Sequence, residues 1–321
     1  MYAVEAHRPD LLEWLLTEGF DANATDDFGQ TPLFLAAQNG DAVCVDLLLQ
    51  AGADPKKGPT YSSPIEEAHH FVVVRQLLAA GEDLRQISDE VRQELLGVTP
   101  GDPRATKQQY QAGKHPRFGR SNPERMENPF WRAMVHAGCN AYFARRLFED
   151  TDYRQSNAPV WCYERFGRTT TLLPDGRIVE IAGEHEDFYD PDFCIYNDVV
   201  VFDGKGQVEI LGYPESVFPP TDFHSATLVG DSIFIIGCLG YPEQRKSGET
   251  PVYRLACSPF KITQVLATGE KPGWISHHTA WYEPEAHRIC LHGGKVVGKD
   301  STPNPWTYAL DLQIYRWTRL P

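Results

Sequence analysis

The residues best suited to chemistry gather in one stretch, GEHEDFYDPDFCIYND, at positions 183–198. Its potential metal ligands are Glu184, His185, Glu186, Asp187, Asp190 and Asp192. Carboxylates at this density could bind a hard cation such as calcium. The EF-hand spacing fails because Cys194 and Ile195 follow where an oxygen ligand and a glycine belong, and HExxH fails because Tyr189 replaces the second histidine. A divalent-cation site is therefore the alternative here, and a solvated loop on a binding face is the favoured interpretation.

Basic side chains recur at one position of a repeated segment. The three copies, here called cassettes, are GRTTTLLPDGRIVEIAG (167–183), FHSATLVGDSIFIIGCLG (223–240) and HHTAWYEPEAHRICLHGG (277–294). Arg168, His224 and His278 stand near the start of successive cassettes. Together they would form a recognition site, but a repeated histidine serves equally well as a hydrogen-bonding group at a strand start. Both interpretations stay open, and a catalytic role is disfavoured.

Strands must position these side chains. Each cassette reads as a strand, a tight turn and an apolar strand that ends at glycine, and the equivalent glycines at 183, 237 and 294 are 54 and 57 residues apart. Further strands follow each cassette, in IYNDVVVFDGKGQVEIL, PVYRLACSPFKITQVL and TYALDLQIYRWTRL. Repeated supersecondary units of this kind predict that residues 159–321 are all β. An extra strand is predicted at Val160–Phe166.

These repeats resemble the kelch motif of β-propeller blades. The resemblance rests on Phe223-His224-Ser225-Ala226, Gly293-Gly294, Tyr196-Asn197-Asp198 and Trp317. Propellers typically close four to eight blades into a ring that leaves no long free edges, whereas three blades are counted here. Three alternatives follow: an incomplete, edge-capped propeller, a six-bladed ring shared by two chains of a homodimer, or a ring edge that the helical middle of the chain plugs.

Residues 1–97 carry a helical repeat. The segments LLEWLLTEGFDAN, VDLLLQAGADP and VRQLLAAGEDL place leucines on one helical face and stop at Gly19, Gly52 and Gly81. The middle copy resembles the ankyrin repeat, whose TPLHxA pattern reads here as residues 31–36, with Thr31 capping the helix. A terminal capping helix is predicted at Asp89–Leu96. The resemblance implies protein binding through hairpin tips, which here carry Asp26, Asp27 and Phe28.

Residues 98–158 join the two repeat regions. Their first part is rich in Pro, Gly, Lys and Arg, and PFWRAMVHAGCNAYFARRLFED then predicts two helices broken near Gly138. The pair Arg145-Arg146 could make this a basic docking element. Packing helices that bridge the repeat regions are favoured, because the aromatic residues require burial.

Charge and cysteine content narrow the function classes. The net charge is −14, and residues 1–100 hold 6 Lys and Arg against 17 Asp and Glu. Such an acidic body disfavours binding to nucleic acid or to anionic membranes, which needs a positive surface. The 7 cysteines form no CxxC pair, and no signal peptide or membrane-spanning run is evident, so a cytoplasmic location is predicted.

Taken as a whole, the chain resembles a little-characterised bacterial group that joins ankyrin repeats to a kelch-like tail. SNPERMENPFWRAM (121–134) and the 183–198 stretch carry this resemblance. The predicted fold is multidomain α + β: an ankyrin solenoid at 1–97, a connector with packing helices at 98–158, and kelch-like blades at 159–321. The favoured function is a non-enzymatic scaffold, without a cofactor, that binds another protein carrying a basic segment. The alternative is a propeller-type enzyme or metal-binding protein that uses the acidic stretch and the cassette histidines.

Overall fold

The computed structural model describes residues 1–80, 93, 95–99, 101–151, 158–187, 190–204, 206–298 and 301–321. The side chains of residues 187, 190 and 191 are outside this description. Contacts divide the chain into two compact units, which we call the N-terminal unit, Met1–Gly97, and the sheet unit, Val98–Pro321.

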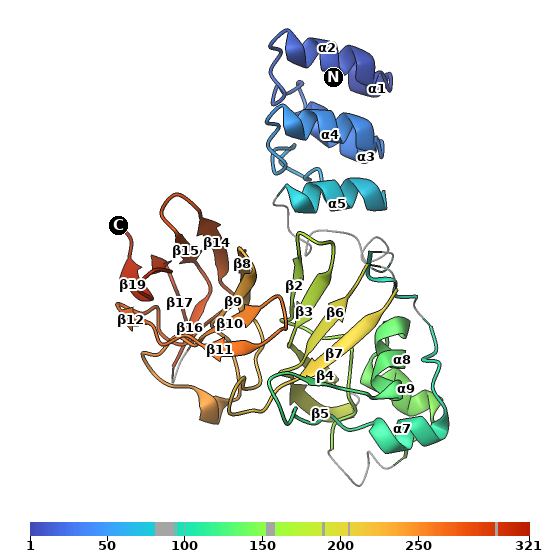
Figure 1. Cartoon of the computed structure of the whole chain (residues 1–321), viewed down its shortest axis with the longest axis vertical. Coiled ribbons are helices and arrows are strands. Elements are labelled where there is room, and N and C mark those ends of the chain that lie inside the picture. The colour runs from blue at the N-terminus through green and yellow to red at the C-terminus, as the bar shows by residue number, and fades with distance from the viewer. Residues whose placement is uncertain are drawn as a thin grey trace. The chain divides into compact units, whose positions relative to one another are not determined.

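The N-terminal unit is built from short helices in antiparallel pairs (Figure 1). The described helices are α1 (Tyr2–Glu5), α2 (Pro9–Thr17), α3 (Pro32–Gln38), α4 (Ala42–Gln50) and α5 (Phe71–Ala79). The predicted cap on α3 is confirmed, because the Thr31 side chain accepts a hydrogen bond from the Phe34 amide and Pro32 occupies the first turn. The third copy has α5 but no regular helix over residues 63–70. The capping helix predicted at Asp89–Leu96 lies largely outside the described residues.

The sheet unit begins with helices α7 (Lys107–Gly113), α8 (Pro129–Ala137) and α9 (Ala141–Leu147). The predicted break between the last two is confirmed, since Gly138 ends α8 in the left-handed conformation with a φ of 60°. Helix α7 was missed in a segment that reads as a connector. It is held by a capping box, in which Thr106 and Gln109 each bond the other's backbone amide.

Three antiparallel sheets make up most of the sheet unit. Sheet I contains β2 (Thr169–Leu172), β3 (Ile178–Ile181), β6 (Val199–Phe202), β7 (Val208–Gly212) and the added β1 (Glu124–Arg125). Sheet II contains β8 (Ser225–Val229), β9 (Ser232–Ile236), β10 (Val252–Ala256) and β11 (Ile262–Gln264). Sheet III contains β14 (Thr279–Glu283), β15 (Arg288–His292), β18 (Thr307–Asp311), β19 (Arg316–Arg319) and the added β12 (Thr268–Gly269).

Smaller elements complete this unit. A separate three-stranded sheet consists of β13 (Ile275–Ser276), β16 (Lys295–Val297) and β17 (Ser301–Pro303). A short 3-10 helix, η3, spans Pro242–Gln244. Strands β4 (Glu184–Asp187) and β5 (Asp190–Ile195) pair as an antiparallel hairpin. The acidic stretch is therefore largely a strand pair, not the solvated loop that its composition suggests. The strand predicted at Val160–Phe166 is absent from the described backbone, which has one isolated bridge there, between Phe166 and Glu184.

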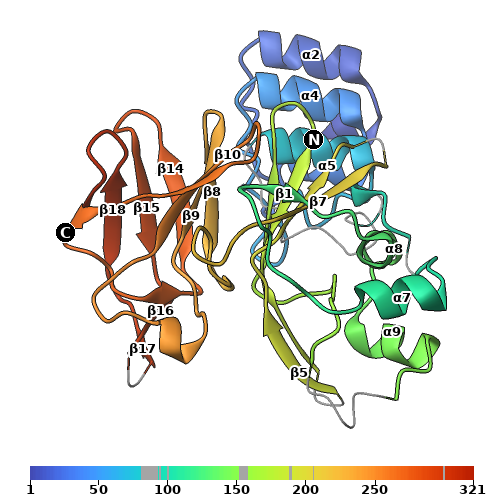
Figure 2. The same ribbon diagram turned by 60° about the horizontal axis from the view of Figure 1, so that its bottom comes forward.

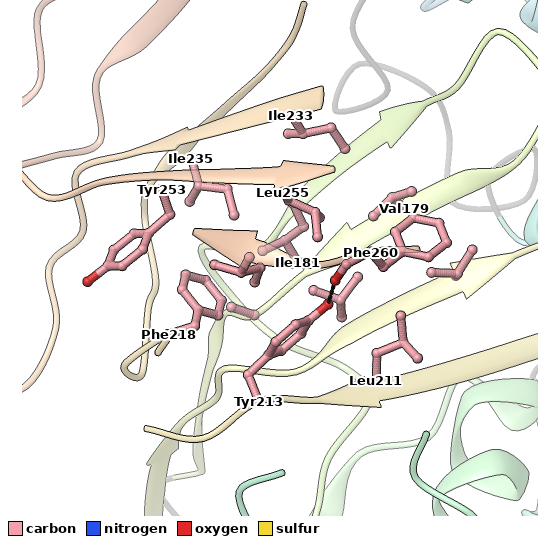
Figure 3. Close-up of a cluster of buried hydrophobic side chains, with 14 of the residues drawn as sticks. Val179, Ile181, Leu211, Tyr213, Phe218, Ile233, Ile235, Tyr253, Leu255 and Phe260 are labelled. Carbon is pink, nitrogen blue, oxygen red and sulfur yellow. Dashed lines mark hydrogen bonds between the residues drawn. The ribbon is translucent and has the colours of Figure 1, made fainter. Parts of the chain in front are cut away.

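The three sheets stand side by side in chain order, with sheet II between the other two (Figures 1 and 2). One apolar cluster fills the space between sheets I and II, where Val179, Ile181 and Leu211 meet Ile233 and Leu255 (Figure 3). The Tyr213 hydroxyl donates to the Phe260 carbonyl at 2.8 Å and so ties the two sheets together within this cluster. A second apolar cluster joins sheets II and III. Face-to-face burial of alternate strand residues is what holds the row together.

The two ends of this row differ. On sheet I, the face turned away from sheet II is also buried, and the Tyr163 ring contacts Phe202 on it. Helix α8 packs on β7, and Met126 lies against Gly212. On sheet III, the outward face carries the half-exposed Trp281. The helical middle of the chain therefore covers one end of the row of sheets.

All seven cysteine side chains are buried and unpaired. No helix among the described residues is long and apolar enough to cross a bilayer.

Candidate functional site

Two strongly exposed aromatic side chains of the N-terminal unit stand on successive loops. Phe28 lies before α3 with 76% of its surface exposed, and Tyr61 lies 33 positions later with 68% exposed. Both residues lie shortly before the Thr/Ser-Pro segment of their repeat, and the Gln30 side chain donates to the Tyr61 hydroxyl at 3.3 Å. Exposed aromatic rings are costly in water, and their rigid surface favours protein contacts.

The two aspartates predicted beside Phe28 have different roles. The Asp26 carboxylate accepts hydrogen bonds from the backbone amides of Phe28 and Gln30, each at 2.9 Å, so it builds the loop. Asp27 is exposed and has no polar partner among the described residues. Asp27 and Phe28 are therefore free to contact a partner, whereas Asp26 holds the loop that presents them.

The three cassette starts of the sheet unit lie next to one another. Their residues Gly167, Phe223 and His277 share the left-handed backbone conformation, with φ of 62°, 46° and 58°. The Phe223 amide donates to the Gly167 carbonyl at 2.8 Å, and the His277 amide donates to the Phe223 carbonyl at 2.9 Å. The rings of Phe223 and His277 stack with centroids 4.0 Å apart. The repeat thus places equivalent residues in contact across neighbouring sheets.

The predicted cassette histidines lie inside this arrangement. His224 bonds through Nε2 to the Thr169 hydroxyl at 2.7 Å, and His278 through Nε2 to the Ser225 hydroxyl at 2.9 Å. Each ring therefore links its sheet to the preceding one, and the rings are only 6% and 4% exposed. The Arg168 side chain instead forms an ion pair with Glu180, with Nη1 3.3 Å from Oε2. A partner-binding role for these side chains stays a prediction, and their hydrogen bonds fit the alternative role at strand starts.

A carboxyl pair lies near the same cassette starts. Asp222 is fully buried, and its Oδ1 accepts a hydrogen bond from the Gly240 amide at 2.6 Å. Glu184 is brought beside it because the neighbouring Gly183 amide donates to the Thr221 carbonyl at 2.9 Å. Burial, followed by contact with Asp222, raises the pKa of Glu184 to about 7. Burial also raises the pKa of Asp222. Glu184 therefore keeps its proton to a higher pH than an exposed carboxyl group does.

The Glu184→Gln variant tests this pair. Because Glu184 binds its proton more tightly in the folded chain than in the unfolded chain, stability falls as pH rises from about 4.5 to about 7. A glutamine cannot ionise, so we expect this variant to unfold at a higher temperature than the wild type at pH 8, with a smaller difference at pH 5. Thermal unfolding at both pH values measures this, and Glu186→Gln is the exposed control. An equal difference at both pH values would contradict the raised pKa of Glu184.

The other predicted metal ligands face different partners. His185 is buried, with Nδ1 2.6 Å from the Tyr196 hydroxyl and Nε2 3.4 Å from Asp192. Asp192 also pairs with Arg145 at 3.1 Å. Burial opposes the charged form, but hydrogen bonds from His185, the Val160 amide and Arg145 hold the pKa of Asp192 below its ordinary value. Within the described part of the chain, no three His, Cys, Asp or Glu side chains gather so that they could hold a metal ion. The side chains of Asp187 and Asp190 lie outside that part.

Comparison with known proteins bears on the N-terminal unit. The ankyrin-repeat family matches residues 1–88 in three copies. Residues 1–88 are ankyrin repeats. The chain is also 41% identical over 68 residues to the mitochondrial disaggregase of Bos taurus, a match that covers 21% of this chain and 10% of that protein. The chain therefore spans about a tenth of the length of the curated relative. Ankyrin repeats are typically non-enzymatic modules that bind other proteins.

Several residues of these sites were missed by the sequence argument. Tyr61 lies just before Ser63-Pro64-Ile65, the counterpart of Thr31-Pro32-Leu33, so the repeat pattern could have placed it on a loop. Asp222 gives no local signal, because its neighbour Glu184 lies 38 residues earlier, just after the preceding cassette. Arg145 was read as part of a packing helix, and its partner Asp192 lies 47 residues further along the chain.

Proposed function

We propose that the protein is a non-enzymatic scaffold whose ankyrin repeats bind a basic and partly apolar segment of another protein. The observation that carries this proposal is the exposed pair Phe28 and Tyr61, presented on successive loops beside Asp27. Aromatic side chains supply much of the binding energy at protein interfaces, and neighbouring charges mainly set the association rate and specificity. The acidic character of residues 1–100 fits a positively charged partner.

We further infer that sheets I, II and III are three kelch-like blades. Each has a core of four antiparallel strands, and the first strands pack in order, β2 on β8 and β8 on β14. This supports a role for the sheet unit as a second platform for partners. A metal-binding or catalytic role built on the 184–198 stretch and the cassette histidines is the rival function, and a metal analysis of the purified protein separates the two proposals.

The interaction proposal is tested with proteins captured from a cell lysate on the immobilised chain. A specific partner should be retained by the wild type and lost from Asp27→Lys and from Phe28→Ala. With the purified partner, we expect Phe28→Ala to weaken binding at least tenfold, as for a central interface aromatic. Asp27→Lys should lower mainly the association rate, and this effect should shrink at high salt.

Asp26 is left unchanged in these variants, because it holds the loop backbone. Matched controls lie on α4, where Asp46 and Val43 are exposed. Asp46→Lys and Val43→Ala repeat the same changes in charge and apolar surface away from the loops. If the controls lose the partner as strongly as the loop variants do, the loops are not the binding surface. If no partner is captured, the ankyrin proposal fails.

A further inference from the structure

The outermost strands of the three sheets differ in whether an added strand pairs with them. On sheet I, the outermost strand β7 is paired with the added strand β1, through Glu124 opposite Gly212 and Arg125 opposite Leu211. On sheet III, the outermost strand β19 is paired with β12, through Thr268 opposite Arg316 and Gly269 opposite Trp317. On sheet II, the outermost strand is β11, and no further strand pairs with it within the described residues.

The register of sheet II shows which backbone groups of β11 are not hydrogen-bonded to β10. The Val265 amide donates to the Val252 carbonyl at 2.9 Å. The backbone amide and carbonyl groups of the odd-numbered residues in this segment therefore point toward β10. Ile262 and Gln264 stand opposite Leu255 and Tyr253 in the intervening, non-bonded positions. In an antiparallel pair, the amide and carbonyl groups of such residues point away from the partner strand.

One of these outward positions already shows how the edge is used. The Ile262 amide donates to the Asn122 side-chain oxygen at 2.9 Å, and the Asn122 amide group donates to the Ile262 carbonyl at 2.7 Å. The Asn122 side chain thus makes the two hydrogen bonds that a residue of a neighbouring strand would make with Ile262. The next outward position, Gln264, has no such partner among the described residues, and Leu266 beyond it is 80% exposed.

A cavity lies against this free part of the edge. Its volume is about 930 Å³, which is in the range of sites that hold peptides and small molecules. Gln264 and Leu266 line one side of it, Pro219 and Pro220 line another, and the largely buried rings of Tyr253 and Trp274 contribute apolar surface. Charged side chains, among them Lys246, Glu249 and Lys271, also line this cavity. An exposed strand edge beside a cavity with apolar surface is a geometry in which an extended peptide adds a strand and places alternate side chains in pockets.

We propose that the free edge of sheet II, at Gln264 of β11 and the exposed Leu266 that follows the strand, binds an extended segment of a partner protein as an additional strand, with an apolar side chain of that segment in the adjoining cavity. Sheet II would then gain an outer strand like those of sheets I and III. This site is separate from the ankyrin loops and does not depend on them.

The experiment begins with octapeptides displayed on phage and selected on the full-length chain. Selected peptides are synthesised, and their dissociation constants are measured by fluorescence polarisation. Gln264→Pro removes the outward amide but no bond to β10, since proline is accepted on an edge strand where its nitrogen faces outward. We expect this variant to bind the peptides about tenfold more weakly, as for the loss of one or two hydrogen bonds. Gln264→Thr keeps the amide and should retain binding.

A second measurement leaves the protein unchanged. Methylation of the peptide's backbone nitrogens, one at a time, should abolish binding at alternate residues only, because every second amide faces the strand edge. Phe28→Ala should bind the peptides normally, which separates this site from the ankyrin surface. Equal binding by Gln264→Pro, uniform tolerance of methylation, or failure to select any peptide would overturn the proposal. Self-association that is lost in Gln264→Pro would also overturn it, by assigning the edge to a second copy of the chain.

Discussion

Replacing Asp198 by alanine is expected to lower the free energy of unfolding of the sheet unit by about 3–5 kcal/mol, the usual cost of breaking a buried ion pair. Asp198 and Arg165 form a bidentate pair whose side chains are only 8% and 4% exposed. Asp198 also accepts from the Trp161 indole nitrogen at 2.8 Å. The Arg165 guanidinium lies over the Tyr196 ring at 3.5 Å and over the Trp161 ring at 4.8 Å. Without Asp198, the buried Arg165 cation loses its counterion, although two backbone carbonyls still accept from it, and the Trp161 indole loses its acceptor.

Urea unfolding followed by tryptophan fluorescence measures this loss, because every tryptophan except Trp14 lies in the sheet unit. The matched control is Asp175→Ala, which breaks the more exposed pair of Asp175 with Arg177, 2.7 Å apart. That change should cost under about 1 kcal/mol, as surface ion pairs do. Similar losses in the two variants would show that the Arg165–Asp198 pair is not the determinant of stability that its burial indicates.

Acid is expected to unfold the sheet unit partly through His224. Burial, followed by the neighbouring His278, lowers the pKa of His224 to about 3, so the ring stays neutral in the folded chain. In the unfolded chain the ring takes up a proton near its ordinary pKa of about 6.5. The unfolded state therefore binds more protons between these pH values, and stability falls by about 1.4 kcal/mol for each pH unit below 6.5.

The His224→Gln variant isolates this contribution, since its amide can still meet the Thr169 hydroxyl but cannot take up a proton. We expect the free energy of unfolding of the variant to fall less steeply between pH 6.5 and pH 4.5 than that of the wild type. The exposed His292 provides the control, and His292→Gln should leave the slope unchanged. Parallel slopes in wild type and His224→Gln would rule out the buried ring as a source of acid sensitivity.

Local sequence patterns predicted the positions of helices and strands better than they predicted which strands pair. The glycine period at Gly19 and Gly52 identified the helical repeats, and apolar runs closed by glycine identified the cassette strands, because both signals arise from neighbouring residues. Helix α7 was missed because it is short and buries only Tyr110, so it shows no apolar periodicity, although Thr106 and Gln109 carry a capping signal. The β4–β5 pair was predicted as a solvated loop, because its sequence is rich in acidic residues.

The candidate sites were harder to predict, because they depend on contacts between distant segments. Phe28 and Asp27 were identified since the ankyrin pattern places them on a loop. The burial of His224 and His278 could not be inferred, because it requires the neighbouring sheets to be in place. The free edge at Gln264 becomes visible only when β11 is compared with the outer strands of the other two sheets.

The unequal ends of the sheet row make the fold extensible in one direction only. At sheet I, the chain's own helical segment occupies the face that a preceding blade would need. At sheet III, the outward face is open, and the exposed Thr279 stands at the position where Thr169 and Ser225 each meet the histidine of the following sheet. A protein engineer who wished to lengthen this array would therefore fuse a further repeat after β19, with a histidine placed to meet Thr279. A repeat inserted before β2 would first have to displace the helices.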